Sequence, residues 1–391
     1  MRPPPDAQER ALFAALIGQS VANIDTPALV IDLDAMERNL RRMQAFANQH
    51  GVRLRPHAKM HKSGALARMQ MAAGAVGVCV QKVSEAQALV AAGVTDIYVS
   101  NQVIALQKCE LLAHITQGLA AKNGRVAVAV DSLLGVERIA QAMLSHANGA
   151  TIDVLVELDV GQQRCGVPPG DAALHLVQAI AQHRQLRFAG LQAYHGRAQH
   201  LRSARERRDT IAAVVADVQR TKAVIKAAGF AVPLVTGAGT GSFLHEASSG
   251  VYGELQAGSY LFMDADYAAN AQDPAQPVFE HALFVKSQVM SLSVQAGRAV
   301  LDAGHKSYAI DSGMPTIWAG HQADWTVSNC SDEHGTLLGS TLPALGDTVW
   351  LIPGHCDPTV NLHDHMLGVR GGLHSGHVED VIWVDARGAL T

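Results

Sequence analysis

Cysteine is scarce in this 391-residue chain, which has five cysteines at wide spacing and no C-x-x-C pair. An odd number of scattered thiols argues against a disulfide-stabilised fold and predicts reduced cysteines in a cytoplasm. No uninterrupted apolar run approaches the length that is needed to cross a membrane. The first ten residues, MRPPPDAQER, lack the apolar centre of a secretion signal. We therefore expect a cytoplasmic protein that does not insert into membranes.

An excess of positive charge is also missing, because 31 basic residues are outnumbered by 35 acidic ones and the formal net charge is −4. Proteins that bind nucleic acid or anionic membranes present basic surfaces, so neither kind of partner is expected. Hydrophobic residues make up 48% of the chain and charged residues 17%, which allows a sizeable buried core and excludes wholesale disorder. The length indicates two domains, or one barrel with an addition.

Short apolar segments alternate with helical patterns through the middle of the chain. Continuous β-branched runs that are separated by helices indicate parallel strands buried on both faces. The expected strands are 52–58, 75–81, 96–101, 125–131, 152–159, 187–194, 233–239 and 253–260. This repetition predicts an α/β fold with a closed (β/α)8 barrel of the TIM type, and a doubly wound open sheet is the alternative.

The pattern changes after about residue 272, where the linker-like stretch 270–277 is followed by alternating strands without long helices. We therefore predict a cofactor-binding barrel over residues 34–272 and a smaller, mainly antiparallel β domain over residues 273–391. A strand at 26–33 falls outside the barrel count and is expected to join the sheet of the β domain. Residues 1–25 are left as an N-terminal extension.

Two lysines and two histidines crowd the stretch RPHAKMHKS, residues 55–63, at the end of the first predicted barrel strand. In a barrel of this type the reactive residues lie at the carboxyl ends of the strands. Lys59 directly continues the strand, whereas Lys62 comes one helical turn later and is expected to face solvent. Two solvated lysines without a function are the alternative.

A glycine-rich loop, TGAGTGS, follows the seventh predicted strand. Gly237, Gly239 and Gly241 expose backbone N–H groups that can hold a phosphate, and Thr240 adds a hydroxyl. The loop is neither a Walker sequence nor G-x-G-x-x-G, and a tight turn that needs small residues explains it equally well. A phosphate site and a strand-end lysine in one barrel suggest pyridoxal phosphate, held covalently by that lysine.

The stretch PGHCDPTVNLHDH, near the C-terminal end, combines imidazole and carboxylate groups. On a strand, residues i and i+2 share a face, so we expect His355 and Asp357 to point the same way and Cys356 to point the opposite way. This pair suits a divalent ion such as Mn²⁺, with Mg²⁺, Co²⁺ and Zn²⁺ as alternatives. A turn at Asp-Pro without any metal is the other interpretation. Further candidates for ligands or supporting groups are His363, Asp364 and His365.

Taken together, these motifs resemble those of the D-threonine aldolases, which belong to the alanine-racemase-like, fold-type III pyridoxal phosphate enzymes. The motifs are DTPALVIDLDAMERNL, RPHAKMHKS, QKVSEA, DVGQQRCGV, AGLQAYHG, TGAGTGS, ELQAGSYLFMDADY, DEHG and GHCDPTVNLHD. They run in the same order from about residue 24 to the end of the chain. The resemblance implies a homodimeric carbon–carbon lyase that cleaves D-β-hydroxy-α-amino acids to glycine and an aldehyde.

The resemblance also implies roles for individual residues. Lys59 matches the lysine that binds the cofactor, Arg164 matches an arginine near its phenolic oxygen, and Tyr194 is similar to residues near its ring nitrogen. His195 or a metal-bound hydroxide would remove the proton of the substrate β-hydroxyl. The groups expected at the phosphate are Gly237, Gly239, Thr240 and Gly241, with Ser259 and Tyr260 nearby. The pair that matches the metal ligands is His355 and Asp357.

Alternatives remain within and beyond this family. CSDEHG and DSGMP resemble D-3-hydroxyaspartate aldolase at least as much, and that enzyme would release glycine and glyoxylate. D-serine dehydratases carry a cysteine two residues after the histidine, where this chain has Asp357, so aldol cleavage is favoured over elimination. A racemase or decarboxylase of the same fold would need no metal. A non-catalytic cofactor carrier is usually a bare barrel without an added β domain.

Overall fold

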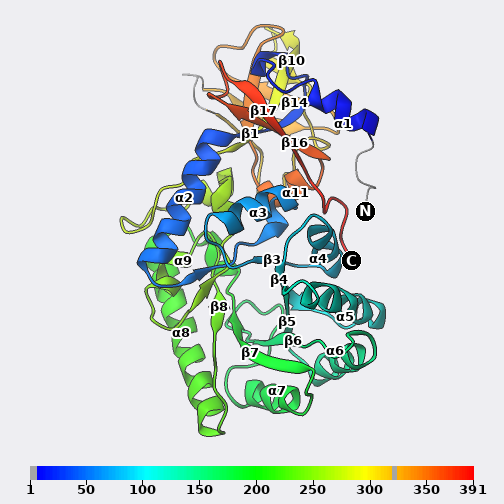
Figure 1. The fold of residues 1–391 in the computed structure, drawn as a ribbon. Coiled ribbons are helices and arrows are strands. Elements are labelled where there is room, and N and C mark those ends of the chain that lie inside the picture. Colours follow the sequence, from blue (N-terminus) through cyan, green and yellow to red (C-terminus); the bar gives the residue numbers. More distant parts are fainter. Residues whose placement is uncertain (1–6, 319–323) are drawn as a thin grey trace.

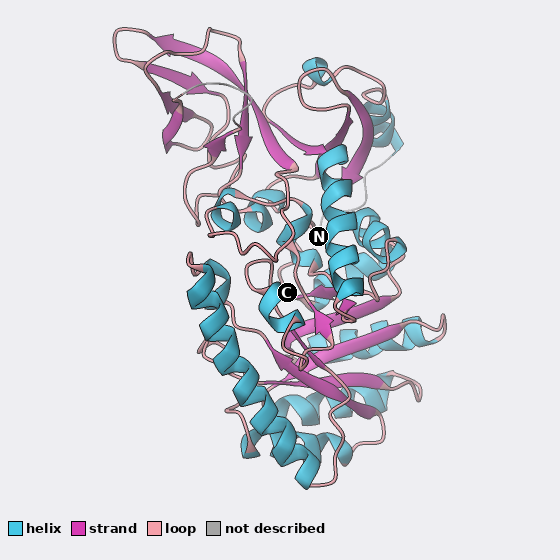
Figure 2. Cartoon of the chain, turned by 90° about the vertical axis from the view of Figure 1, so that its left-hand side faces the viewer, coloured by secondary structure: helices cyan, strands magenta, loops and turns pink. Residues whose placement is uncertain are grey.

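The protein folds into a parallel barrel and a mainly antiparallel β domain, as the sequence predicts (Figure 1). The computed structural model describes residues 7–318 and 324–391. Residues 1–6 of the predicted N-terminal extension therefore lie outside the described residues. Figure 2 shows the strands of the β domain at one end of the molecule and the barrel strands at the other, with helices around the barrel.

The barrel strands are all parallel and pair in the order β2-β9-β8-β7-β6-β5-β4-β3. They are β2 (Arg53–Leu54), β3 (Val78–Val80), β4 (Asp96–Gln102), β5 (Arg125–Val130), β6 (Ile152–Glu157), β7 (Leu186–Ala193), β8 (Val235–Gly237) and β9 (Glu254–Leu255). Each of them overlaps one of the segments that the sequence predicts as a strand.

The two ends of this sheet meet and close it. The Val76 N–H donates to the Leu54 carbonyl at 2.9 Å, and the Cys79 N–H donates to the Pro56 carbonyl at 2.8 Å. His57 and Cys79 also form a parallel bridge. The open doubly wound sheet is therefore excluded, and the carboxyl ends of all the strands surround one opening.

Helices connect the strands and cover the outside of the barrel. The helices of this part are α2 (Leu33–Gln49), α3 (Gly64–Ala72), α4 (Val83–Ala91), α5 (Leu106–Ala120), α6 (Leu133–His146), α7 (Asp171–Ala181), α8 (Ala204–Ala227), α9 (Phe243–Ala247) and α10 (Ala265–Ala268). Single 3₁₀ turns are η2 (Ala58–Met60), η3 (Arg197–His200) and η4 (Ser259–Leu261). Of the helices in the described residues, none is long and apolar enough to span a membrane.

The β domain is built around strand β1, which is the first strand of the chain. Its strands are β1 (Ala28–Asp32), β10 (Leu283–Ser293), β11 (Arg298–Leu301), β12 (Thr316–Ile317), β13 (Thr326–Cys330), β14 (Gly335–Leu338), β15 (Thr348–Ile352), β16 (His365–Arg370) and β17 (His377–Trp383). β1 pairs antiparallel with β10 and parallel with β16. Its helical elements are α1 (Ala7–Ala14), η1 (Val21–Asn23) and α11 (Cys356–Val360). The domain boundary that we place at residue 272 stays a prediction.

Helix α2 lies where the two domains meet. The Asp32 carboxylate caps its N-terminus by accepting the Ala35 N–H at 3.0 Å. Met36, Leu40 and Met43 follow at helical spacing and are buried. This buried stripe forms one face of a core that both domains share.

That shared core crosses from one sheet to the other. It contains Leu29 of β1, Met36 of α2, Leu54 of β2, Tyr260 of η4 and Val285 of β10 in one contiguous cluster of buried side chains. Because interiors are packed about as densely as crystals, such a core restrains relative displacement of the elements that it joins. Groups contributed by the β domain are thereby held in place above the opening of the barrel.

Candidate active site

A cavity of about 330 Å³ lies at the carboxyl ends of the barrel strands, within the size range of small-molecule sites. The predicted site residues that line it are Lys59, Arg164, Tyr194, Gly239, Thr240 and Ser259. Those that are not part of its lining are His195, Gly237, Gly241, Tyr260, His355 and Asp357. The structure therefore brings about half of the predicted residues into the lining of one cavity.

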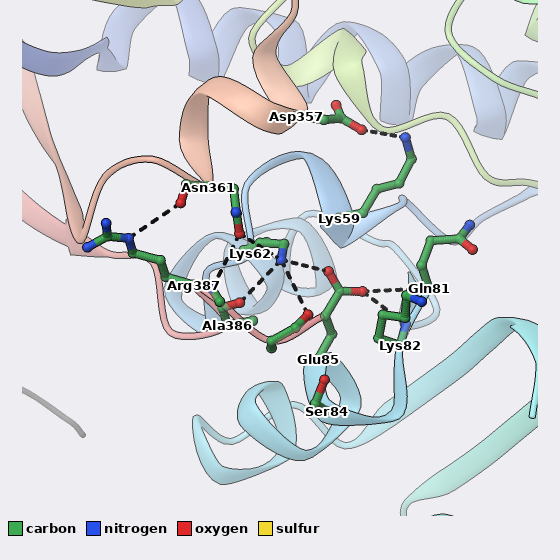
Figure 3. A network of polar contacts seen from close by, with 12 residues as sticks. Lys59, Lys62, Gln81, Lys82, Ser84, Glu85, Asp357, Asn361, Ala386 and Arg387 are labelled. Atoms are coloured by element: carbon green, nitrogen blue, oxygen red, sulfur yellow. Dashed lines mark hydrogen bonds and ion pairs between the residues drawn. The ribbon is translucent and has the colours of Figure 1, made fainter. Parts of the chain in front are cut away.

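Lys59 sits in the 3₁₀ turn η2, directly after the first barrel strand. The His57 side chain caps this turn, with Nδ1 accepting the Lys59 N–H at 3.3 Å. The Lys59 amine forms an ion pair with Oδ2 of Asp357, which belongs to the β domain (Figure 3). Burial lowers the pKa of this amine, but the charge of Asp357 outweighs it, and the pKa is raised above the usual lysine value. Without a cofactor the lysine is therefore a cation paired across the two domains.

Lys62 does not face solvent, and this part of the prediction is wrong. Its side chain is only 7% exposed, and the ammonium lies 3.2 Å from Oε1 of Glu85 and 3.0 Å from Oδ1 of Asn361. The chain turns back after η2 with a positive φ of 51° at Lys62, which directs this residue into the protein. The two lysines of the motif thus occupy different environments, one at the cavity and one beneath it.

Arg164 and Tyr194 face each other at the cavity. The guanidinium carbon of Arg164 lies 5.9 Å from the centre of the Tyr194 ring, which is within range of a cation–π contact. Burial raises the pKa of the Tyr194 phenol, although the charges of Lys59 and Arg164 oppose this. The phenol is therefore protonated at neutral pH and can donate a hydrogen bond.

The glycine-rich loop follows β8 and presents Gly239 and Thr240 to the cavity. Gln199 fixes the loop from behind, since its Oε1 accepts the Gly241 N–H at 3.0 Å. A Cβ atom at Gly239 would lie 2.5 Å from the same Oε1 atom, so only glycine fits there without displacing the amide. The Thr240 hydroxyl oxygen accepts the Tyr260 N–H at 3.0 Å, which ties the loop to η4.

Several of the residues predicted to bind the phosphate make structural contacts in the fold. The Gly241 N–H is already bound to Gln199. A Cβ at Gly237 would lie 2.4 Å from the Ala193 carbonyl of the neighbouring strand, so this glycine permits strand pairing. The buried Tyr260 hydroxyl accepts a hydrogen bond from Gln70 at 3.2 Å.

His195 follows β7 and points toward its own loop. Its Nδ1 accepts the Ala198 N–H at 3.2 Å, so Nε2 carries the proton when the ring is neutral. A Cβ at Gly161 would lie 3.0 Å from His195 Nε2, which places the 159–166 loop against this ring. Burial lowers the pKa of His195, so the neutral ring is favoured.

His355 and Asp357 come together, but not on a strand as the sequence suggests. β15 ends at Ile352, His355 is the residue before helix α11, and Asp357 lies in its first turn. His355 Nε2 and Asp357 Oδ1 are 3.7 Å apart, while the buried Cys356 donates its N–H to Asp264 at 3.0 Å. His355 and Asp357 therefore lie side by side as expected, but at the start of a helix and not on one face of a strand.

The donor set of this pair fits a divalent ion. Asp357 Oδ1 is buried and has no hydrogen-bond partner among the described residues, which leaves it available as a ligand. His355 Nδ1 lies 2.7 Å from Oδ2 of Asp311, and a carboxylate in that position orients a ligating imidazole. Burial lowers the pKa of His355, but the charge of Asp357 and the bond with Asp311 outweigh it and raise the pKa.

The other candidates in this stretch lie elsewhere. His363 Nε2 lies 2.8 Å from the Ser307 carbonyl, Asp364 pairs with Arg387, and the His365 ring packs on Trp383. Within residues 7–318 and 324–391, no group of three or more His, Cys, Asp or Glu side chains forms a metal site. The pair of His355 and Asp357 thus stands without a third protein ligand in the described part of the chain.

Sequence reasoning missed the groups that hold these residues in place. Asp311 supports His355 from 44 positions away, and Gln199 supports the glycine loop from 42 positions away. Asp264 accepts the first helical N–H group of α11. Asp311 is the first residue of the motif DSGMP, which is the one indication in the sequence that this aspartate belongs to the site.

Comparison with known proteins finds two domain families in the chain. Residues 31–266 match the family described as "alanine racemase, N-terminal domain". Residues 282–369 match a family described as "putative serine dehydratase domain". The first match covers the barrel and the second covers most of the β domain.

Characterised relatives match over nearly the whole length. The chain is 45% identical over 374 residues to a D-threonine aldolase of Arthrobacter sp., covering 95% of each chain. It is 41% identical to a 3-hydroxy-D-aspartate aldolase of Paracoccus denitrificans, covering 96% of this chain and 95% of the relative. The crystal structure of a D-threonine aldolase from Filomicrobium marinum superposes with a TM-score of 0.90 at 47% identity, covering 96% of this chain and 99% of that one.

Proposed function

The chain belongs to the alanine-racemase-like family of D-threonine and 3-hydroxy-D-aspartate aldolases, and we propose that it cleaves D-β-hydroxy-α-amino acids of the D-threonine type. As a member of this family it is a carbon–carbon lyase that acts on D-amino acids, and the family implies pyridoxal phosphate. The products would be glycine and an aldehyde. We further propose that the reaction needs a divalent metal ion, with Mn²⁺ as the first candidate.

One observation carries this proposal. Asp357 contacts the Lys59 amine with Oδ2 and lies beside His355 with Oδ1, so a single carboxylate joins the lysine of the barrel to the imidazole of the β domain. A substrate attached near Lys59 would thus present its β-hydroxyl to the metal pair. A racemase of this fold would need no metal and therefore no such pair of ligands.

The cavity residues fit pyridoxal phosphate. They offer an amine on Lys59, a guanidinium on Arg164, a phenol on Tyr194 and hydroxyls on Thr240 and Ser259. When bound, the cofactor would take up the electron pair that is released as the Cα–Cβ bond breaks. Lys59 would bind it covalently, and the glycine loop with Thr240 and Ser259 would hold its phosphate.

Tyr194 would account for a requirement for the proposed metal ion. Its phenol is protonated, so it would donate a hydrogen bond to the ring nitrogen of the cofactor and leave that nitrogen uncharged. An uncharged ring withdraws electrons less strongly. A metal ion at His355 and Asp357 would act as a Lewis acid on the substrate β-hydroxyl and lower its pKa.

The acceptor of the β-hydroxyl proton is His195 or a hydroxide from solvent at the metal pair. For His195 the structure sets a condition, because Nδ1 accepts the Ala198 N–H and Nε2 carries the proton. The ring must give up that backbone bond before it can accept a proton. The homodimer that the resemblance implies and the cytoplasmic location that the cysteine content predicts stay predictions.

A product assay tests the proposed function. Purified enzyme with pyridoxal phosphate and Mn²⁺ is given D-threonine, D-3-hydroxyaspartate or D-serine, and glycine, acetaldehyde, glyoxylate and pyruvate are measured. Glycine with acetaldehyde supports the D-threonine type, and faster release of glycine with glyoxylate supports the 3-hydroxyaspartate aldolase as the second candidate. Pyruvate without glycine, or racemisation alone, would overturn the assignment in favour of β-elimination or racemase chemistry.

A further inference from the structure

Lys62 is a buried cation that has no role in the proposed reaction. Its ammonium donates to Asn361 Oδ1 at 3.0 Å and to the Ala386 carbonyl at 3.3 Å, and it pairs with Glu85 at 3.2 Å (Figure 3). Moving a charge out of water is costly unless it is paired and hydrogen-bonded. Here the charge is matched by a carboxylate that is itself buried.

The backbone of Lys62 is fixed as firmly as its side chain. Its N–H donates to the Ala58 carbonyl at 2.7 Å, and its carbonyl accepts the Ala386 N–H at 3.0 Å. Lys62 is therefore attached to the turn η2 that carries Lys59 and to the C-terminal segment of the chain at the same time.

The contact with Asn361 reaches the metal pair. Asn361 terminates helix α11, a single turn whose first residues include Asp357. The Asn361 N–H donates to the Asp357 carbonyl at 3.4 Å, so the two residues are joined through the helix backbone. In so short a helix, a shift of the end that Lys62 holds also shifts the carboxylate at the other end.

The contact with Glu85 reaches residues that line the cavity. Glu85 Oε2 accepts the N–H groups of Gln81 at 2.9 Å and Lys82 at 3.1 Å, and both residues line the cavity. Gln81 Nε2 lies 2.9 Å from His57 Nε2, beside the cap of the Lys59 turn. One ammonium thus connects the cofactor turn, the cavity wall and the helix with Asp357.

The C-terminal segment completes this arrangement. Asp385 Oδ2 accepts the Gly64 N–H at 2.7 Å, and the carbonyl of the last residue, Thr391, accepts the Ser84 N–H at 3.0 Å. The end of the β domain is therefore attached to the barrel next to Lys62.

We propose that Lys62 is a positioning residue that sets the distance between Lys59 and the metal pair by holding α11 and the cavity wall together. This inference rests on the proposed function, since it assigns a role to the pair of His355 and Asp357. Lys62 touches neither cofactor nor substrate in this account. Its loss should affect metal binding more than cofactor binding.

The test replaces Lys62 by methionine in the holoenzyme, which keeps the apolar stem and removes the charge. A second variant combines Lys62→Met with Glu85→Gln, so that no buried carboxylate is left unpaired. The matched control is Lys286→Met, because Lys286 is also buried and donates to the carbonyls of Val21, Ala22 and Ile24 in the β domain, away from the cavity.

Metal affinity is measured by titration with Mn²⁺ under electron paramagnetic resonance, and backbone mobility by hydrogen exchange. Loss of groups that support metal ligands costs roughly 10- to 100-fold in affinity, and we expect a change of that order for Lys62→Met. Peptides that span 356–361 should exchange faster, while cofactor absorbance is retained. The double variant should recover thermal stability but not Mn²⁺ affinity, and Lys286→Met should lose stability without loss of affinity.

Unchanged Mn²⁺ affinity and unchanged exchange at 356–361 in the double variant would overturn the inference. Asp357→Asn separates this result from failure of the proposed function. If Asp357→Asn loses Mn²⁺ binding while the Lys62 variants keep it, the metal pair stands and the role of Lys62 is wrong. If Asp357→Asn binds Mn²⁺ as tightly as the unchanged enzyme, the metal pair itself is wrong, and the inference fails with it.

Discussion

Two lysines three positions apart show how strongly the local environment decides the role of a side chain. The Lys59 side chain is 41% exposed and lines the cavity, whereas Lys62 is enclosed by oxygen atoms of three other segments. Formation of a covalent bond with a carbonyl requires a free amine that can lose its proton. Of the two lysines, only Lys59 has an amine that a cofactor in the cavity can reach.

Borohydride reduction of the holoenzyme should therefore attach the cofactor to Lys59 and not to Lys62. Peptide mapping by mass spectrometry distinguishes the two sites, because the added mass can be assigned to one residue. Lys59→Ala should abolish the adduct and nearly all turnover. Attachment at Lys62 in the unchanged enzyme would contradict the assignment.

At the scale of single residues, the sequence predicts the reactive side chains better than the residues that hold them in position. Lys59 and the pair of His355 and Asp357 are visible because each falls within one short motif. Asp311 and Gln199 act on them from distant segments, and only the fold brings them close. The prediction that Lys62 faces solvent is wrong because it rests on a continuing helical turn, whereas the chain adopts a positive φ at this residue.

Among the elements, the glycine loop depends on one amide behind it. Gly239→Ala should weaken cofactor binding about tenfold, or about 1.4 kcal/mol, because the new Cβ would lie 2.5 Å from Gln199 Oε1 and displace it. Absorbance titration with pyridoxal phosphate measures this. The control is Gly118→Ala in α5, where a Cβ meets no atom within 4 Å, so cofactor affinity should not change. Equal affinity in both variants would show that the loop tolerates the displacement.

Helix α9, which follows the same loop, contains a carboxyl group that should make stability depend on pH. Burial raises the pKa of Glu246 from 4.5 to about 7, and its Oε1 lies 2.7 Å from the Ser242 hydroxyl. Between about pH 4.5 and pH 7 the Glu246 carboxyl group is ionised in the unfolded chain but still protonated in the folded protein. A rise in pH through this range therefore lowers the free energy of unfolding. Above about pH 7 the contribution no longer changes.

Glu246→Gln should remove this fall in stability between about pH 4.5 and pH 7. Melting temperatures across the window measure the slope for the variant, for the unchanged protein and for Glu110→Gln, which changes an exposed glutamate on α5. Only the Glu246 variant should differ. The same slope in all three proteins would mean that Glu246 does not hold its proton in the folded state.

Helices and strands can be predicted where the hydrophobic periodicity and the residue composition indicate the same element, as in the eight strands of the barrel. Helix α11 was not, because His-Cys-Asp-Pro also fits a strand that ends in a turn. Two features favour the helix: proline is tolerated in a first turn, and an acidic residue there is stabilised by the helix dipole. Asp264 also favours the helix, because it accepts the Cys356 N–H, but this contact cannot be seen in the local sequence.

Over the whole molecule, the site depends on two domains that share a core. The barrel supplies Lys59 and the β domain supplies Asp357, and α2 packs between both sheets. Neither His355 nor Asp357 belongs to this core, so we expect the fold not to depend on the ion. Two protein ligands also leave coordination positions open, which is typical of a catalytic ion and not of a structural one.

The most direct test of this account is the rate of glycine release from D-threonine by holoenzyme that has been freed of metal and verified by elemental analysis. We predict that cleavage falls to background while cofactor absorbance and melting temperature are retained, and that Mn²⁺ restores the rate. Asp357→Asn should behave like the metal-free enzyme even with Mn²⁺ present. Cleavage at the full rate by verified metal-free enzyme would contradict the account.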